Sequence, residues 1–291
     1  MMKQVCTAVL LAFVGLFGVA QESSAPRVAI PLIVTDSHHR PTPVTVESLA
    51  ITDQKTLVTG ASLVRGVDFP VELGVLIDAS SSQRSADLVE ILNTAKRFVD
   101  ESIRGPEDRV FFLKFDAAPH ATGWFKREQL QSATIPVGIG GGTALYDALA
   151  MACKERMGLR DWQKPARRIL VLISDGEDNL SHTTRDEAAL DALRAGAVIF
   201  TIDTELSGMS YRGVKIMQNL AEVTGGRSFS QVGREDAPKV FASIKEMIDG
   251  MYYLRYVPPN ASSSAVHEVK VNRTPKEKFK VSYARKYLWK Q

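Results

Sequence analysis

The feature that most constrains the fold is an alternation of apolar segments and helical patterns between residues 70 and 255. Four segments are apolar along almost their whole length: Val71–Ile77, Arg109–Phe115, Arg168–Ser174 and Ala197–Ile202. Strands that are apolar on both faces belong to a sheet covered on both sides, and helices between them give parallel connections. The sequence therefore predicts an α/β fold with a doubly wound, mostly parallel sheet.

Helical patterns fill the spaces between these segments. Apolar residues recur at helical spacing from Leu88 to Ile103. Thr184 and Glu187 have the spacing of a capping box, and Gly196 stands where the end of a helix favours glycine. The other elements predicted in this region are helices at Ala144–Met157, Ala188–Arg194, Val214–Val223 and Asp236–Met251 and a short strand at Arg227–Val232.

The two ends of the chain have a different, β-rich pattern. Arg27–Val34 is predicted as a strand, and its Pro31 favours an edge position. Half-exposed strands are expected at Tyr252–Val257, His267–Asn272 and Lys278–Tyr283. We expect the N-terminal segment 27–69 and the C-terminal segment 256–291 to pair as a small β-rich domain that flanks the α/β domain, residues 70–255.

The first twenty residues have the pattern of a secretory signal. Lys3 precedes the uncharged apolar run Val5–Ala20, which ends in small residues. We expect a signal peptide at residues 1–20, cleavage after Ala20 and a secreted or periplasmic protein. An uncleaved anchor is the alternative, although the run is shorter than the roughly 20 residues of a spanning helix. Cleavage leaves Cys153 as the one cysteine, which we expect in the core.

The charge of the chain is nearly balanced. It carries 36 Lys and Arg against 33 Asp and Glu, a formal net charge of +3. A nucleic-acid-binding protein needs a concentrated basic face, so we expect no nucleic-acid partner. The sequence requires no membrane contact beyond the signal and leaves the oligomeric state open.

Oxygen-bearing side chains gather where the predicted strands end. Asp78, Ser80 and Ser82 follow the first apolar strand, Asp175 follows the third, and Thr143 begins a helix after a glycine-rich loop. Ligands of open parallel sheets bind beyond the carboxyl ends of the strands. Carboxylate and hydroxyl oxygens suit Mg²⁺, Mn²⁺ or Ca²⁺ rather than Zn²⁺. We therefore expect a divalent cation at this edge.

Other features of the same loops carry weaker expectations. Glu177 and Asp178 are predicted in a solvated turn, and Asp203 as a turn cap or a surface charge. The glycine loop, which includes Gly138, lacks the lysine of a phosphate-binding loop. None of these residues is predicted as a metal ligand.

The five metal-site candidates, taken together, resemble the metal-ion-dependent adhesion site of a von Willebrand factor A domain. The resemblance covers residues 70–255, and GGTALYDAL and LISDGEDN are typical of that family. VTDSHHRPTPVTVESLAI near the start, with MYYLRYVPP and ARKYLW near the end, further resembles the secreted bacterial group of such proteins. Ser81 and Gln83 depart from the common residues, but neither is a ligand in the family.

The resemblance implies a role for each candidate. Ser80 and Ser82 would bind the metal through their hydroxyls, and Thr143 would bind it in the active state. Asp78 and Asp175 would act mainly through coordinated water. A carboxylate from an Asp or Glu of a protein partner would complete the coordination of Mg²⁺, Mn²⁺ or Ca²⁺. The expected function is metal-dependent protein binding in adhesion or scaffolding, without enzymatic activity.

A metal-dependent hydrolase or phosphoesterase on the same edge is the alternative function. A hydrolase needs a base beside its nucleophile. The nearest histidine, His182, lies seven residues beyond Asp175, and Ser80 lacks the GxSxG context of a nucleophile elbow. The sequence therefore favours binding over hydrolysis.

Overall fold

The computed structural model describes residues 27–81, 85–133, 140–206, 210–259 and 266–289, with the side chains of 85–88 excepted. The predicted signal peptide, the candidate ligand Ser82 and Gly138 lie outside the described residues.

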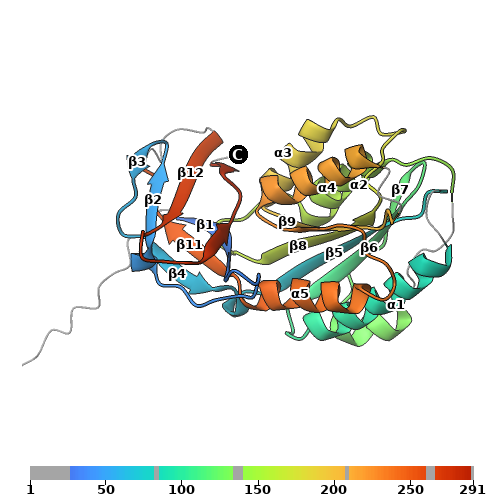
Figure 1. Ribbon diagram of the computed structural model, residues 1–291, viewed down its shortest axis with the longest axis horizontal. Coiled ribbons are helices and arrows are strands. Elements are labelled where there is room, and N and C mark those ends of the chain that lie inside the picture. Colours follow the sequence, from blue (N-terminus) through green and yellow to red (C-terminus); the bar gives the residue numbers. More distant parts are fainter. Residues whose placement is uncertain (1–26, 82–84, 134–139, 207–209, 260–265, 290–291) are drawn as a thin grey trace, which may run out of the picture.

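A six-stranded sheet forms the centre of the α/β domain (Figure 1), in the order β10-β9-β8-β5-β6-β7. Its strands are β5 (Val71–Asp78), β6 (Arg109–Phe115), β7 (Pro119–Ala121), β8 (Arg167–Ser174), β9 (Val198–Asp203) and β10 (Ser228–Phe229). All neighbouring pairs are parallel except β6 and β7, which are antiparallel at one edge. The predicted doubly wound, mostly parallel sheet is confirmed. Of the predicted strand at Arg227–Val232, only the two residues of β10 are paired.

Helices cover both faces of this sheet (Figure 1). They are α1 (Ser85–Ser102) and α5 (Ala237–Asp249) on one face, and α2 (Leu145–Met151), α3 (Arg185–Ala195) and α4 (Tyr211–Thr224) on the other. Short 3-10 helices lie at Val46–Ser48, Gly66–Asp68 and Arg127–Ser132. Among the described residues, no helix combines the length and the apolar character that a membrane crossing requires.

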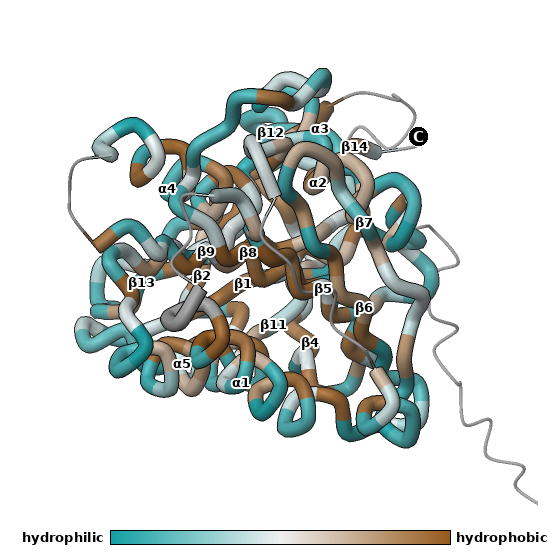
Figure 2. The backbone as a smooth tube through the Cα atoms, turned by 90° about the vertical axis from the view of Figure 1, so that its right-hand side faces the viewer, coloured by the Kyte–Doolittle hydropathy of each residue, from teal (hydrophilic) through white to brown (hydrophobic). Residues whose placement is uncertain are grey.

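Two hydrophobic cores, one on each face, explain the uninterrupted apolar strands. Val75 and Ile77 lie in the core beneath α1 and α5, whereas Leu76 lies in the core beneath α2, α3 and α4. Figure 2 shows the apolar residues concentrated along the central strands, with hydrophilic turns outside them. Cys153 belongs to the second core as predicted, and burial raises the pKa of its thiol to about 12.

Local signals set the helix boundaries. Thr184 caps α3 by accepting the N–H of Glu187, whose carboxylate accepts the N–H of Thr184 in return. Gly196 follows α3 at φ 69°, a left-handed conformation that glycine adopts without strain. The predicted helix Ala144–Met157 is divided, because α2 continues as a π-helix at Ala152–Met157.

The terminal segments form two small antiparallel sheets, in the orders β13-β1-β11-β4 and β14-β12-β2-β3. The strands are β1 (Val28–Thr35), β2 (Leu49–Asp53), β3 (Thr56–Leu57), β4 (Ser62–Arg65), β11 (Tyr252–Tyr256), β12 (Val266–Arg273), β13 (Lys280–Ser282) and β14 (Lys286–Leu288). β1 pairs with β11 and β13, and β12 pairs with β2. The predicted β-rich unit built from both ends of the chain is confirmed.

Strand β1 joins this unit to the α/β domain. Its residues alternate between two cores: Ala29 and Ile33 face the α/β core, while Ile30 and Leu32 face the core of the terminal sheets. The edge position predicted from Pro31 holds locally, because β11 pairs with β1 up to Leu32 and β13 begins only at Ile33. Pro31 therefore has a paired strand on one side only, and its missing N–H removes no hydrogen bond to a strand on the other side.

A buried polar cluster fastens the terminal strands to one another. Asp53 of β2 accepts hydrogen bonds from the hydroxyls of Tyr256 and Tyr287, on β11 and β14. Its other oxygen lies 2.9 Å from Nδ1 of His267 on β12. All four side chains are almost completely buried. Buried polar groups are costly unless paired, so this cluster favours one arrangement of the four strands.

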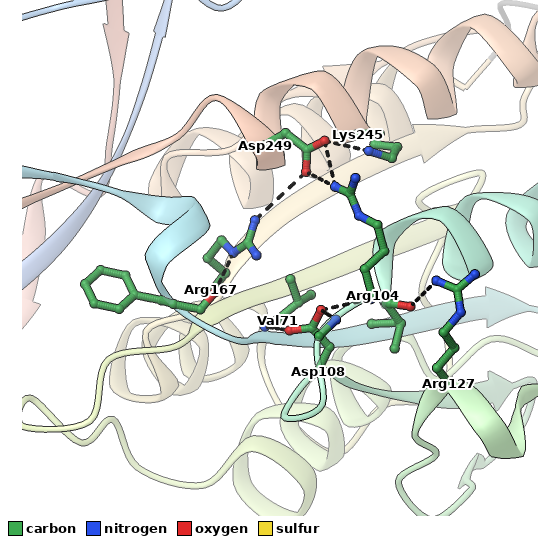
Figure 3. A network of polar contacts seen from close by, with 10 residues as sticks. Val71, Arg104, Asp108, Arg127, Arg167, Lys245 and Asp249 are labelled. Carbon is green, nitrogen blue, oxygen red and sulfur yellow. Dashed lines mark hydrogen bonds and ion pairs between the residues drawn. The ribbon is translucent and has the colours of Figure 1, made fainter.

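A second polar network lies where the central strands begin (Figure 3). Asp108 accepts the backbone N–H groups of Val71, Arg104 and Gly105 at 2.7–2.9 Å. Asp249, at the end of α5, contacts the guanidinium of Arg104 at 3.0 Å and the ammonium of Lys245. The network ties the ends of α1 and α5 to the amino edge of the sheet.

Candidate metal centre

Three loops meet at the opposite, carboxyl edge of the sheet. β5 and β8 are adjacent and parallel, so the residues that follow both strands emerge side by side. The structure brings four predicted ligands to this edge, and all are buried: Asp78 (0% exposed), Ser80 (2%), Thr143 (3%) and Asp175 (6%). All four residues are therefore shielded from bulk solvent.

Backbone hydrogen bonds connect the first two loops. The N–H of Gly140 donates to the carbonyl of Ala79 at 2.8 Å, and the hydroxyl of Ser81 donates to the carbonyl of Gly141 at 3.2 Å. A Cβ atom on Gly140 would lie 2.2 Å from the carboxylate of Asp116, so the close approach of this loop requires glycine. The glycine loop is therefore held against the Asp78 loop.

Thr143 links the glycine loop to the third loop. Its N–H donates to Oδ1 of Asn179 at 2.8 Å, and its carbonyl accepts the N–H groups of Asn179 and Leu180 at 3.0 Å. These contacts fix the backbone on both sides of the Thr143 side chain. The three loops consequently form one hydrogen-bonded cluster around the four described candidates.

Asp78 lies at the centre of this cluster. One of its oxygens accepts the N–H of Ser80 at 2.9 Å, and the other accepts the hydroxyl of Ser174 at 2.6 Å. Burial raises the pKa of the Asp78 carboxyl to about 6, although its hydrogen bonds from Ser174 and Ser80 oppose the rise. The negative charge of Asp175 adds to it. The site thus disfavours an anionic Asp78 in the absence of a compensating positive charge.

Asp203 is a third buried carboxylate at this edge. It is paired in register with Ser174 and is completely buried. One oxygen accepts the N–H of Glu205 at 2.9 Å, whereas Oδ2 has no hydrogen-bond partner among the described residues. Burial raises the pKa of Asp203, and the charge of Asp175 contributes. The expected turn cap is therefore present, but the expected surface charge is wrong, because the side chain is completely buried beside the segment after β10, where Val232 donates its N–H to the carbonyl of Asp203.

Glu177 and Asp178 connect the third loop to two helices. Oδ1 of Asp178 accepts the N–H of Leu145 at 2.9 Å and the hydroxyl of Ser181 at 2.6 Å. The hydroxyl of Ser210 donates to the carboxylate of Glu177. Both acidic residues are half-buried, so the solvated turn predicted from the sequence is wrong. Their carboxylates hold the starts of α2 and α4 beside the cluster.

Two facing glycines bring α4 against the site. A Cβ atom on Gly213 would lie 2.1 Å from the carbonyl oxygen of Asp175. Gly176, at φ 79°, would place a Cβ atom 2.4 Å from the carbonyl oxygen of Gly213. Neither position accepts a side chain, so the first turn of α4 is in direct backbone contact with a candidate ligand.

The donor chemistry of the cluster fits a hard divalent cation. The described candidates offer two carboxylates and two hydroxyls, and the buried, partly unpaired Asp203 adds negative charge. Within the described part of the chain, no group of three or more His, Cys, Asp or Glu side chains is arranged to hold a metal. Any metal ligation here would therefore depend on hydroxyl oxygens as well as carboxylates.

His182, the histidine nearest to Asp175 in the sequence, lies beside Asp147 at the surface. The side chain of His182 is 98% exposed, and its Nδ1 lies 3.4 Å from the carboxylate of Asp147. Hydrogen bonds from the loop around Thr183 hold the pKa of Asp147 at about 2, against the opposing effect of its burial. His182 therefore contacts Asp147, which holds the loop around Thr183, and does not contact a candidate nucleophile.

Comparison with solved structures gives similar folds at low sequence identity. A von Willebrand factor type A protein from Catenulispora acidiphila is 11% identical, with a TM-score of 0.48, over 92% of this chain and 75% of that one. The vWF domain of the type V pili tip protein Mfa5 from Porphyromonas gingivalis is 14% identical, with a TM-score of 0.49, over 64% of this chain and 96% of that one. The manganese-loaded TRAP protein of Plasmodium vivax is 12% identical, with a TM-score of 0.42, over 80% of this chain and 97% of that one.

These similarities concern the fold alone. No protein-family model matches the chain, and no curated protein matches it either. The doubly wound architecture is established by the strand order and helix placement of this chain itself. This doubly wound architecture agrees with the fold that the sequence resemblance to von Willebrand factor A domains implies.

Proposed function

We propose that this protein is a secreted or periplasmic module that binds a protein partner through a divalent cation. The ligands would be Asp78, Ser80, Ser82, Thr143 and Asp175, with Mg²⁺ as the expected ion and Mn²⁺ or Ca²⁺ as alternatives. One observation carries the proposal: buried carboxylates gather at the carboxyl edge of the sheet without a basic side chain to balance Asp78 or Asp203 among the described residues.

Electrostatics supports a cation at this place. Burying a carboxylate is costly unless it is paired, and like charges close together increase the cost. Asp78 and Asp203 both experience the charge of Asp175. A divalent cation would neutralise this cluster, and the buried hydroxyls of Ser80 and Thr143 would supply neutral oxygen ligands.

Neutral ligands would leave the cation able to bind a further anion. When bound, the ion supplies a coordination place for an external carboxylate. The protein groups hold the loops in place: Asn179 fixes Thr143, and Ser174 orients Asp78. An exposed Asp or Glu of a partner is the ligand that fits such a place, so we infer protein binding rather than catalysis.

Calorimetry tests the metal site directly. Titration of the mature chain with Mg²⁺ or Mn²⁺ should give binding heat, and saturation should raise the melting temperature. At a free-metal concentration about 100 times the Kd, the stabilisation should be about 2.7 kcal/mol. Thr143→Ala should weaken binding, whereas Thr56→Ala, on an exposed strand, serves as the matched control. Absence of heat with a melting curve unchanged by EDTA would contradict the proposal.

Secretion is tested separately from binding. N-terminal sequencing of the mature protein should begin at Gln21 if residues 1–20 are a cleaved signal. A mature chain that retains Met1 and stays with the membrane fraction would support the uncleaved anchor instead.

A further inference from the structure

A groove with a positive lining lies beside the candidate metal centre. Its volume is about 630 Å³, and it lies between the starts of α2, α3 and α4. The residues that matter for its chemistry are Tyr146, Arg185, Asp186, Tyr211, Arg212 and Lys215. Three are basic and one is acidic, so the lining has a net positive charge.

The basic groups of the groove are accessible to a ligand. Arg185, Arg212 and Lys215 are all exposed. The Arg185 guanidinium contacts Asp186 at 3.1 Å, and the Lys215 ammonium lies 5.4 Å from the ring centre of Tyr211. Because Asp186 is the one acidic residue in the lining, Arg212 and Lys215 add positive charge that the groove itself does not neutralise.

Backbone contacts place this groove next to the metal candidates. Arg212 immediately precedes Gly213, which lies against the backbone of Asp175. Tyr146 lies three residues after Thr143, and its N–H donates to the hydroxyl of Ser181 at 3.0 Å. The groove and the candidate metal centre therefore share the same loops and the same edge of the sheet.

Large apolar side chains are exposed in the groove and on other loops of the same edge. Tyr211 is 71% exposed, and Leu180 and Leu206, on two loops of the same edge, are 45% and 43% exposed. Large apolar groups on a surface often mark an interaction site when they occur with polar neighbours. This combination suits a protein segment better than an isolated ion.

We infer that the partner is an acidic protein segment with at least two carboxylates, one for the metal and another for the groove. The inference rests on the proposed function, since the metal takes the first carboxylate. Arg212 and Lys215 attract the second carboxylate, and Tyr211 contacts the aliphatic part of the segment. Charge complementarity of this kind selects partners and accelerates their association.

Fluorescence anisotropy with a labelled hexaglutamate peptide tests the inference on the mature chain in Mg²⁺. The double substitution R212E/K215E should weaken peptide binding about tenfold, because two attractive charges become repulsive. The double substitution K96E/K239E makes the same charge change on exposed positions of α1 and α5 and should leave the affinity within about twofold. Binding of N-acetylglutamate amide, which has one carboxylate, should be equal in both variants.

The outcomes separate the groove from the metal centre. If EDTA abolishes peptide binding but R212E/K215E matches K96E/K239E, the groove inference fails and the metal-dependent function stands. If EDTA has no effect but R212E/K215E still weakens binding, the groove contact is supported, whereas the proposed metal-dependent function and the metal-bound carboxylate of the inference fail. If wild-type protein does not bind hexaglutamate in Mg²⁺, the groove inference is overturned, and metal titration alone then decides the proposed function.

Discussion

The two edges of the central sheet both contain aspartates, but their surroundings have opposite electrostatic character. At the amino edge, Asp249 contacts Arg104 and Lys245, and Asp108 accepts three backbone N–H groups (Figure 3). At the carboxyl edge, Asp78 is hydrogen-bonded by a backbone amide and by hydroxyls, and neither it nor Asp203 has a Lys or Arg partner among the described residues.

This difference separates a structural network from a candidate binding site. The amino edge is neutralised by groups of the chain itself, so its ion pairs and hydrogen bonds serve to hold helices and strands together. At the carboxyl edge, Asp78 and Asp203 have no Lys or Arg partner among the described residues, and their burial disfavours the anionic forms unless a cation is bound. The same residue type can therefore stabilise the fold at one edge and favour ligand binding at the other.

Asp78→Asn should give the largest effect, and it should act on metal binding. We expect at least a 100-fold loss of Mg²⁺ affinity, about 2.7 kcal/mol, because even residues that only hold a metal ligand in place contribute 10–100-fold to metal affinity. Calorimetric titration measures the loss. The melting temperature in EDTA should stay close to that of wild type, since the substitution removes a buried charge. Asp100→Asn, on an exposed position of α1, is the control.

Asp108→Ala should lower the stability of the fold and leave metal binding unchanged, which is the reverse of Asp78→Asn. It leaves the N–H groups of Val71, Arg104 and Gly105 without their acceptor, and we expect a loss of about 2 kcal/mol in the free energy of unfolding. Urea denaturation in EDTA measures this loss. Mg²⁺ affinity should be unchanged; a variant that lost metal binding but kept its stability would reverse the roles that we assign to the two edges.

Asp249→Ala should destabilise the protein less, by about 1 kcal/mol. Asp249 contacts Arg104 and Lys245, but the Arg104 side chain is 55% exposed, and solvent weakens such pairs. Thermal unfolding at low and at high salt measures the effect, which should shrink as salt rises. A loss that is independent of salt would indicate packing rather than ion pairing.

Asp203→Asn should have the smallest effect, a gain of about 0.5 kcal/mol in the stability of the metal-free protein. The substitution removes a buried negative charge that is repelled by the charge of Asp175, although it leaves an amide in a confined space. The gain should be present in EDTA and smaller in saturating Mg²⁺. Lower stability in EDTA would show that the Asp203 carboxylate is not a source of repulsion.

The repeating part of the fold could be predicted from the sequence, because its signals are local. Val71–Ile77 and its parallel neighbours are apolar on both faces, and Thr184 and Glu187 determine the start of α3 by contacts three residues apart. The strand β7 was not predicted, since it contains only three residues and is defined by pairing with β6.

For the candidate site, the sequence indicated which residues follow the strands but not what covers them. Asp78, Ser80, Thr143 and Asp175 lie at one edge as expected, while their metal ligation stays a prediction. Asp203 was expected in a turn or on the surface. Its burial depends on the segment after β10, where Val232 donates its N–H to the carbonyl of Asp203. Such a contact between distant parts of the chain leaves no periodic signal.

The buried Asp53 cluster has a consequence for how the chain is completed. Asp53 is separated by 203 residues from Tyr256 and by 234 from Tyr287. During synthesis from the N-terminus, β2 is therefore made long before Tyr256 and Tyr287, its polar partners. The α/β domain has all of its strands earlier, so the terminal sheets close last, and a prematurely ended chain would expose their unpaired strand edges to aggregation or proteolysis. The cluster thereby makes the pairing of β2 depend on strands that are synthesised 203 and 234 residues later.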